Sequence, residues 1–587
     1  MNYNLNDGIE EIKSKQLGFS SVKSMINQMV EEKRTLLLAF VSMIVAALLN
    51  LAGPFIIGRT VDKYILTGQF HGVLVFSTIL LVTYIVALVA GYLQTRLMGA
   101  VGQRMVFTLR NSVFNKLQEL PYDFFNQNKA GDLISRINND TEKINQFFSQ
   151  SLMQFLRVIL IMIGSGIFLL SLHVQLGAAT LVPAVFMWIF TKIFSPLVKK
   201  RNSNYLKSTG LLSSEIQESL NNFKVMVAFN RRDYFRKRFA GVNQQNYSSA
   251  IQAEISNNMF LPVYTFFSNI GLLIVLGLGI YFIAQGQFTV GLLISFIGYS
   301  NSFYNPLRQM ASLWATFQVA LAAWERIRKI LNLESNLVQV EPGETIESED
   351  LLSFRNVTFA YPGGKEVLHN ISFNLKKGKT YAFVGPTGGG KTTTASLISR
   401  LYDPADGKVL LNGFDIRSYS PAERVKKIGF ILQDPFLFSG TIRENILYGN
   451  EEYSNLTNEE LHKVFVESGL ETLLQRFENG FETKVNMSGE SISLGQKQLV
   501  AFMRAVLRKP ELLILDEATA NIDTMTEKLL DEILHKLPEQ TTKVIIAHRL
   551  NTIANADVIY FVNDGMVTRA GSLADAMDLL MKGKMAS

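Results

Sequence analysis

The chain has 587 residues, a formal net charge of +7 and a hydrophobic share of 48%. This length allows two or three domains, and the hydrophobic share exceeds that of an ordinary soluble protein. The absence of cysteine excludes disulfides and thiolate metal sites. The long apolar runs are concentrated in residues 1–330, whereas residues 350–587 alternate short apolar stretches with charged ones.

Six segments of the N-terminal part are long and apolar enough to cross a bilayer core, which requires about 20 helical residues. They lie at about 35–57, 73–97, 151–172, 175–196, 259–284 and 288–312. Lysine and arginine are concentrated before the first segment and in the second and fourth loops, and the other loops carry few. Since basic loops remain cytoplasmic, we expect a plasma-membrane protein with both ends in the cytoplasm.

This loop bias also accounts for the positive net charge, so no nucleic-acid partner is expected. The first 20 residues are polar and predict no cleavable signal, so the first span would itself direct insertion. Four regions follow from these patterns. They are a cytoplasmic segment at 1–34, a membrane domain at 35–330 with two long cytoplasmic loops, a polar linker at 331–352 and a second domain at 353–587.

A glycine-rich loop, GPTGGGKT at 385–392, follows the short apolar strand YAFV in the second domain. With a helix beginning near Thr392, this is the setting of a P-loop, whose backbone N–H groups close around phosphate. Lys391 is expected to bridge the β and γ phosphates of ATP, and Thr392 to bind Mg²⁺. The predicted ATP-binding residues of this loop are Gly385, Pro386, Thr387, Gly388, Gly389, Gly390, Lys391, Thr392 and Thr393.

A second motif, LLILDE at 512–517, is acidic. It has the form of a Walker B motif, a buried strand that ends in two carboxylates. Asp516 is predicted to help hold Mg²⁺. Glu517 stands where a carboxylate can polarise the attacking water as a general base. The alternative, two acids at an ordinary helix N-terminus, fits the preceding apolar strand less well.

These two motifs, together with SLGQ at 493–496 and AHR at 547–549, occur in the order and at roughly the spacing found in ATP-binding cassette (ABC) proteins. With the preceding membrane region, the chain resembles a half-transporter of the ABC exporter family. The resemblance implies an all-α membrane domain of six helices, fused to an α/β P-loop NTPase domain with a helical subdomain. It also implies ATP and Mg²⁺ as cofactors.

The resemblance assigns further roles residue by residue. Gln433 matches the glutamine that contacts Mg²⁺ and the attacking water, and His548 the switch histidine that senses the γ-phosphate. Tyr361 matches the aromatic residue that stacks on adenine, and Asp523 fits the loop that crosses to the opposing subunit. The implied catalytic set is therefore Glu517, His548, Lys391 and Gln433.

The signature motif departs from the family pattern. The family has Leu-Ser-Gly-Gly-Gln, whose serine and glycine amides contact ATP held by the opposite subunit, whereas this chain has Ser493, Leu494, Gly495 and Gln496 after an isoleucine. Leu494 adds a branched side chain where backbone must approach phosphate. Met487 also replaces a glutamate that is usual in the family. A weakened signature beside an intact P-loop and an intact LLILDE motif indicates one half of a heterodimer with unequal ATP sites. The alternative is a homodimer that tolerates the leucine.

The resemblance also implies that turns of the long cytoplasmic loops dock on the nucleotide-binding domain. One such turn is expected around 121–125, followed by 131–136 and Asp140, and another at 223–230. The alternative is a pair of solvated helical hairpins, which does not explain the apolar and aromatic residues in both stretches.

The expected function is ATP-driven export of hydrophobic or amphipathic compounds, as in multidrug efflux, together with a second half-transporter chain and in contact with membrane lipids. Translocation of a lipid or lipopeptide is a close alternative, because the same apolar cavity suits an acyl chain. A sensor that binds ATP without transporting is a remote one, because Glu517 and His548 are both present.

Overall fold

The computed structural model describes residues 3–5, 25, 32–337, 339–341, 349–486, 492–516, 524–546, 553, 555–571, 574, 575 and 578. The chain forms two compact units. The helical unit contains Gly8–Leu117 and Gly131–Asn332. The other unit, which we call the nucleotide-binding unit, contains Met1–Asp7, Gln118–Ala130 and Leu333–Ser587.

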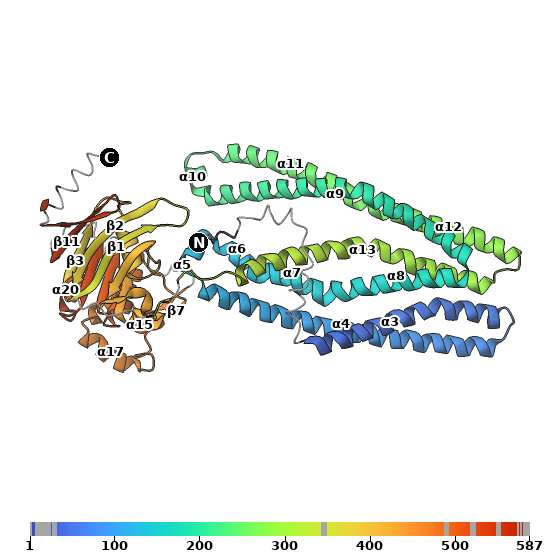
Figure 1. The fold of residues 1–587 in the computed structure, drawn as a ribbon, viewed down its shortest axis with the longest axis horizontal. Helices are drawn as coiled ribbons and strands as arrows, with labels where there is room; N and C mark the ends of the chain where they lie inside the picture. The colour runs from blue at the N-terminus through green and yellow to red at the C-terminus, as the bar shows by residue number, and fades with distance from the viewer. Residues whose placement is uncertain are drawn as a thin grey trace. The chain divides into compact units, whose positions relative to one another are not determined.

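Long helices dominate the helical unit (Figure 1). Its elements are α3 (Lys33–Thr60), η2 (Val61–Ile65), α4 (Phe70–Glu119), α6 (Ala130–Ser135), η3 (Arg136–Asp140), α7 (Thr141–Gln146), η4 (Phe147–Ser151), α8 (Leu152–Leu172), α9 (Val174–Asn221), α10 (Phe223–Ala228), α11 (Arg232–Asn258), α12 (Phe260–Ala284) and α13 (Val290–Leu331). Helices α4 and α9 have 50 and 48 residues. At 1.5 Å per residue each is more than twice as long as the roughly 30 Å hydrocarbon core. The membrane helices therefore continue well beyond a bilayer.

Five stretches of the described residues are long and apolar enough to cross a membrane. They are Lys33–Ile65, Phe70–Glu119, Ala130–Leu172, Val174–Asn221 and Arg232–Ala284. The sixth predicted span falls in α13, which is helical throughout but carries a polar stretch at 300–302 and again at Asn305. These residues lower its hydropathy, so its crossing stays a prediction.

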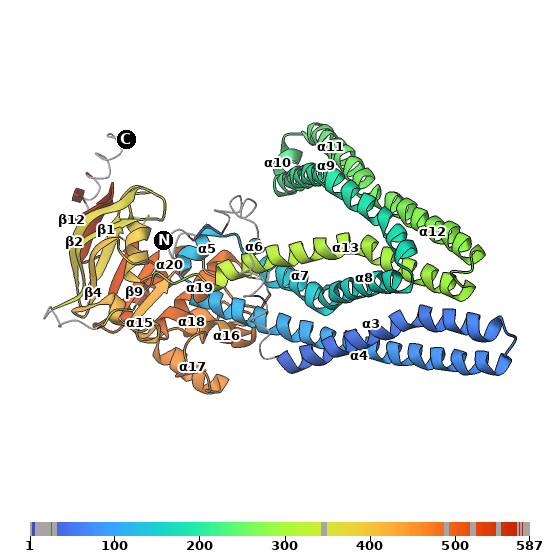
Figure 2. The ribbon, with the colours of Figure 1, turned by 45° about the vertical axis from the view of Figure 1, so that its right-hand side comes forward.

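Helix α13 packs against α3 and α8, and α9 runs beside α11 and α12 (Figures 1 and 2). The contact of α13 with α3 includes hydrogen bonds to backbone carbonyls near Pro54. The Tyr299 hydroxyl donates to Leu51 O at 2.8 Å, and Ser295 Oγ donates to Pro54 O at 2.9 Å. These hydrogen bonds join α13 to the backbone of α3 next to the proline that α3 contains.

The nucleotide-binding unit contains two main sheets. The antiparallel sheet has the order β2 (Glu366–Lys376), β1 (Asp350–Ala360), β4 (Asp406–Leu411), β5 (Phe414–Asp415). The mixed sheet has the order β12 (Met566–Ala570), β11 (Val558–Asn563), β3 (Thr380–Val384), β10 (Thr542–Ile546), β9 (Leu512–Asp516), β6 (Ile428–Ile431). A third, small sheet pairs β7 (Gly440–Thr441) with β8 (Lys484–Val485).

Helices and short turns complete this unit. They are α5 (Tyr122–Gln127), α14 (Lys391–Ile398), η5 (Ile416–Ser418), α15 (Pro421–Lys427), α16 (Ile442–Ile446), α17 (Asn458–Glu467), α18 (Glu471–Leu474), η6 (Gly480–Glu482), α19 (Leu494–Val506) and α20 (Thr524–Lys536). The helical membrane domain and the α/β nucleotide-binding domain together confirm the predicted fold class.

Strand β9 explains why this part of the sequence is continuously apolar. All five of its residues are buried. Leu512 and Ile514 belong to the core shared with the antiparallel sheet, whereas Leu513 and Leu515 belong to the core shared with the helices that include α16 and α19. Parallel strands covered on both faces have this composition, since alternate side chains enter opposite cores.

The fully buried Ile514 provides a test of this packing. Replacing it with alanine should destabilise the domain by about 2–5 kcal/mol, through lost burial and the cavity left behind. We expect the thermal unfolding midpoint of the purified complex to fall by about 5 °C or more. Val425→Ala on α15, at a side chain that is 42% exposed, is the control and should leave the midpoint nearly unchanged. An equal effect of both variants would contradict the assigned core.

Candidate active site

Four parallel strands bring the predicted site residues to one edge of the mixed sheet. Strand β10 lies between β3 and β9, and Ile546 at its end pairs with both Phe383 and Asp516. Strand β6 lies on the other side of β9 and ends two residues before Gln433. Ligands of open α/β sheets bind outside the carboxyl ends of the strands, which is the edge where Asp516 and the start of the P-loop meet.

The P-loop connects β3 directly to α14. Gly385, Gly388 and Gly390 have φ values of 150°, 85° and 111°, a region that glycine adopts readily and other residues rarely do. Lys391 is buried, and its Nζ donates to Gly385 O at 2.9 Å and to Pro386 O at 3.0 Å. The lysine side chain therefore folds back onto carbonyl groups of the loop. It lies beside the N-terminus of α14, and a helix N-terminus favours phosphate binding.

Tyr361 lies next to the first turn of α14. Its hydroxyl is 3.0 Å from Thr393 Oγ1, and its ring packs edge-on against Tyr402 with 5.3 Å between ring centroids. The end of β1 is thereby brought to the P-loop helix, although 30 residues separate them in sequence. The role of Tyr361 beside the base of a nucleotide stays a prediction.

The predicted magnesium ligands come from three elements around this edge. Thr392 lies in the first turn of α14, which packs against β9, and Asp516 is the buried last residue of β9. Gln433 follows β6 and is exposed. One carboxylate, one hydroxyl and one amide oxygen suit Mg²⁺, which completes its octahedral shell with water and substrate phosphate oxygens. The residue types therefore fit this ion.

The signature motif forms the start of α19. Ser493 caps the helix: its Oγ accepts from Gln496 N at 3.2 Å, and Gln496 Oε1 accepts from Ser493 N at 3.0 Å. Leu494 is the first helical residue and is 40% exposed. Neither Leu494 nor Gly495 has a positive φ. The backbone therefore accommodates the leucine without strain. Any effect of Leu494 on a ligand would come from its exposed side chain at the start of α19.

Gln433 is also connected to this helix. Its backbone carbonyl accepts a 3.5 Å hydrogen bond from Nε2 of Gln498, a buried residue of α19. Three further predicted residues, Glu517, His548 and Asp523, lie outside the described residues, and their roles stay predictions.

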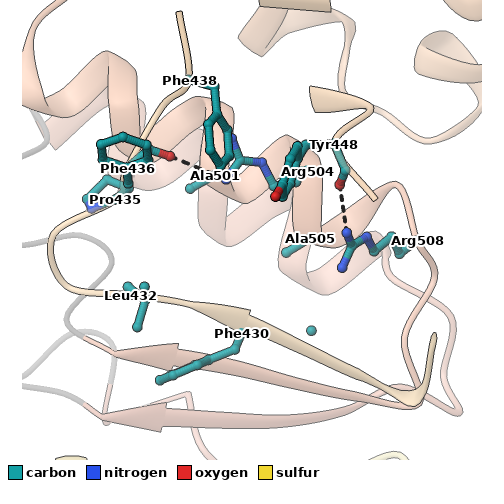
Figure 3. Close-up of a pocket in the computed structure, with 11 residues that line it drawn as sticks. Phe430, Leu432, Pro435, Phe436, Phe438, Tyr448, Ala501, Arg504, Ala505 and Arg508 are labelled. Atoms are coloured by element: carbon teal, nitrogen blue, oxygen red, sulfur yellow. Dashed lines mark hydrogen bonds between the residues drawn. The ribbon is translucent and has the colours of Figure 1, made fainter. Parts of the chain in front are cut away.

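A groove of about 250 Å³ lies beside the segment that follows β6 (Figure 3). Its walls come from β6, the segment after Gln433 and α19. The lining residues are Gly429, Phe430, Leu432, Pro435, Phe436, Phe438, Tyr448, Ala501, Arg504, Ala505 and Arg508. Arg504 Nε donates to Asn445 O at 2.7 Å, and Arg508 Nη2 donates to Tyr448 O at 2.6 Å. Burial lowers the pKa of both arginines, which nevertheless stay charged at neutral pH.

Sequence reasoning missed this groove. The available signal was the run of aromatic residues directly after Gln433. Phe436 is 66% exposed, and Phe438 and Tyr448 are also exposed. Exposed rings beside half-buried cations form a surface suited to contact another segment of protein.

Helix α5, which contains most of the first predicted docking turn, belongs to the nucleotide-binding unit and contacts it directly. Asn126 Nδ2 donates to the Tyr402 hydroxyl at 2.6 Å, and the Tyr122 and Tyr402 rings meet edge-on at 6.0 Å. Burial raises the pKa of Tyr402 to about 12, so its hydroxyl stays neutral at physiological pH. Docking of this turn is confirmed, and Tyr402 is a contact that the sequence did not reveal. The second predicted turn contains α10, in the helical unit, and its docking stays a prediction.

Two family profiles match the chain. The profile described as "ABC transporter transmembrane region" matches residues 36–307, and that described as "ABC transporter" matches residues 368–520. The chain belongs to the ABC transporter family. It is a half-transporter, a multi-pass membrane protein with a fused cytoplasmic nucleotide-binding domain that couples ATP hydrolysis to transport.

Several ABC transporters are similar along most of the chain. The "Uncharacterized ABC transporter ATP-binding protein YfiC" of Bacillus subtilis (strain 168) is 34% identical over 94% of this chain and 91% of its own length. The "Fatty acid ABC transporter ATP-binding/permease protein" of Mycobacterium bovis (strain ATCC BAA-935 / AF2122/97) is 34% identical over 85% of this chain and 78% of its own.

A solved structure supports the ABC exporter fold. It is described as "Structure of a bacterial Atm1-family ABC exporter with ATP bound", and it is similar to this chain with a TM-score of 0.76. The match covers 94% of this chain and 96% of the other at 24% identity. This likeness concerns the fold.

The P-loop of this ABC transporter can be tested at Gly389. A Cβ there would lie 2.6 Å from Val562 O and 3.2 Å from Pro386 O, so backbone would have to move. We expect Gly389→Ala to weaken ATP binding by about tenfold or more, because the loop N–H groups would no longer converge on phosphate. Gly210→Ala in α9, where a Cβ meets open space, is the matched control. Unchanged ATP affinity in Gly389→Ala, measured by titration with a fluorescent ATP analogue, would contradict this description of the loop.

Proposed function

We propose that this chain is one half of a heterodimeric exporter that moves hydrophobic or amphipathic compounds out of the cell by alternating access. The observation that supports a heterodimer concerns the two ATP-binding motifs of this chain. A P-loop and an Asp516 edge suited to ATP coexist with Leu494 exposed at the start of the signature helix. Each chain would therefore contribute differently to two ATP sites.

In the proposed hydrolytic site, this chain supplies the P-loop and the residues at the strand ends. Lys391 would leave the carbonyls of Gly385 and Pro386 to bridge the β and γ phosphates. Thr392, Asp516 and Gln433 would hold Mg²⁺, which neutralises charge that develops on the phosphates. Glu517 would orient and deprotonate the attacking water, and His548 would sense the γ-phosphate.

In the proposed second site, this chain supplies Ser493 and Gly495 to ATP held by the partner. The positive N-terminal end of α19 favours phosphate, but the exposed Leu494 side chain occupies space that a ligand needs for close approach. The partner's Walker B motif at this site would lack its glutamate. Asp523 would reach across from this chain to the opposing subunit.

Transmission to the membrane would use the cytoplasmic turns. The contact of Tyr122 and Asn126 with Tyr402 supports α5 in this role, because Tyr402 also packs against Tyr361 beside the P-loop. ATP-driven closure of the two cassettes would shift the helices from inward-facing to outward-facing, and hydrolysis would reset them.

An apolar groove in the helical unit supports a hydrophobic substrate. It measures about 500 Å³ and lies between α3 and α8. The lining residues are Phe40, Met43, Leu48, Leu51, Leu156, Ile159, Leu160, Ile163, Gly164, Ile167 and Phe168. A relative from Bacillus subtilis (strain 168), 32% identical over 83% of this chain, is described as "Probable multidrug resistance ABC transporter ATP-binding/permease protein YheH". Lipid translocation is the second candidate, because another relative is described as a fatty acid transporter.

The proposed general base is tested by Glu517→Gln in the native complex. We expect steady-state ATPase activity to fall at least a hundredfold, since a positioned base contributes about 10²–10⁴ in rate. Binding of ATP should be retained, because glutamine keeps the shape of the side chain. Glu539→Gln, at an exposed position, is the control. Retained turnover in Glu517→Gln would show that another group activates the water.

The same preparations, as inside-out vesicles, test the transport assignment. ATP-dependent uptake of the dye Hoechst 33342 that is lost in Glu517→Gln would support multidrug export. Movement of a fluorescent phospholipid without dye uptake would support the lipid alternative. ATP hydrolysis with neither would favour the sensor and overturn export.

Leu494→Gly separates the heterodimer from the homodimer. In the heterodimer this residue borders only the site without a catalytic glutamate, so we expect the ATPase rate of the complex to change by less than about twofold. In a homodimer Leu494 would border both hydrolytic sites, and restoring glycine would raise turnover severalfold. A large rise, measured by phosphate release, would therefore contradict the heterodimer.

A further inference from the structure

The first described residues of the chain, Tyr3, Asn4 and Leu5, lie far in sequence from the nucleotide-binding domain but belong to its compact unit. We call these three residues the N-terminal clasp. They connect α5 and the residue that follows it with the linker that leads into the nucleotide-binding domain. No motif at these three positions predicts such a contact.

The backbone of the clasp is hydrogen-bonded to the end of α5. Tyr3 N donates to Gln127 Oε1 at 2.8 Å, and Leu5 N donates to Asn128 Oδ1 at 3.0 Å. Asn128 Nδ2 donates in return to Tyr3 O at 2.9 Å and also to Phe124 O at 2.8 Å. The Asn128 side chain is buried, so its amide is fixed by partners on both segments.

A second amide is oriented in the same way. Gln127 Nε2 donates to the buried Asp123 at 3.0 Å, which leaves Gln127 Oε1 facing the Tyr3 amide. The end of α5 therefore presents preset acceptors to an extended backbone, as a binding site for a chain segment does.

The side chain of Tyr3 reaches the linker. It is 1% exposed, and its ring packs edge-on against Phe124 with 6.2 Å between centroids. Its hydroxyl donates to Glu334 O at 2.9 Å and accepts from Asn336 N at 2.9 Å. Burial raises the pKa of this phenol, so it remains a donor at physiological pH.

The clasp and Tyr402 use different positions of α5. Tyr122 and Asn126 are four residues apart, share one face of the helix and meet Tyr402. Phe124, Gln127 and Asn128 meet the clasp. The helix is thus held both by the nucleotide-binding domain and by the N-terminus of the chain.

We propose that the N-terminal clasp is a positioning segment that locks α5 to linker residues Glu334–Asn336, so that α5 moves with the nucleotide-binding domain as one piece. The consequence for turnover rests on the proposed role of α5 in transmission. The locking itself does not depend on that role, on the transported compound or on the partner. Without the clasp, α5 is held only through Tyr402 among the contacts named above, and closure of the cassettes is passed on incompletely.

Tyr3→Phe tests the proposal in the full complex, since it removes the hydroxyl that joins the linker but keeps the ring on Phe124. The chain has no cysteine, so spin labels can be placed at Lys129→Cys, next to α5, and at the exposed Lys426→Cys. We expect a single narrow distance distribution with the native clasp and one at least twice as wide in Tyr3→Phe. The kcat for ATP should fall about threefold or more while KM stays within twofold, because no clasp residue lies in the P-loop.

Tyr247→Phe, at an exposed tyrosine of α11, is the matched control and should change none of these quantities. A chain lacking residues 2–5 should show the same widening and loss of kcat as Tyr3→Phe, or larger effects. An unchanged distance distribution in both clasp variants would overturn the locking, even if the thermal unfolding midpoint fell. A wider distribution with unchanged kcat would overturn the positioning role while leaving the export function and the heterodimer intact.

Discussion

The parallel pairing of β3, β10 and β9 is the constraint on which the proposed chemistry depends. Because Ile546 pairs with Phe383 on one side and Asp516 on the other, the ends of three strands lie level at one edge. The P-loop begins one residue beyond β3, and the sequence continues from β9 into Glu517 and from β10 toward His548. A shift of one residue in this register would turn every side chain of a strand to the opposite face and disperse the site.

The proposed coupling to the membrane depends on a different kind of contact. The nucleotide-binding unit includes Met1–Asp7, which precede the membrane region in sequence, and residues 118–130, which lie between its second and third predicted spans. Tyr402 contacts both Tyr361, beside the P-loop, and α5, through Tyr122 and Asn126. The boundary between the two compact units therefore does not follow the boundary between membrane and nucleotide-binding sequences.

Much of the fold could be predicted because its physical signals are local. Buried strands such as β9 read as continuous apolar runs, and the bilayer demands long apolar helices, so both appear directly in the sequence. The P-loop was predictable because its glycines, lysine and threonine are adjacent. The crossing by the sixth predicted span stays a prediction, since α13 mixes apolar residues with Asn301 and Asn305.

The remaining features depend on contacts between residues far apart in the chain. Nothing in the local pattern around Tyr402 or Tyr3 indicates that one meets α5 and that the other bridges α5 and the linker. The groove beside the segment that follows β6 forms only when β6 and α19 come together. Signature position 494 shows the opposite case. The sequence identified it, and the structure adds that its backbone is unstrained and that the leucine side chain is exposed.

The proposed heterodimer requires that its two ATP sites be unequal. The most direct measurement is the subunit composition of the complex purified from its native membrane in mild detergent, determined by intact-mass spectrometry. We predict two half-transporters in equal amounts, the partner with an intact signature motif and a residue other than glutamate after its Walker B aspartate. A pure homodimer of this chain that hydrolyses ATP at normal rates would contradict the account, because both of its sites would then function with Leu494 in place.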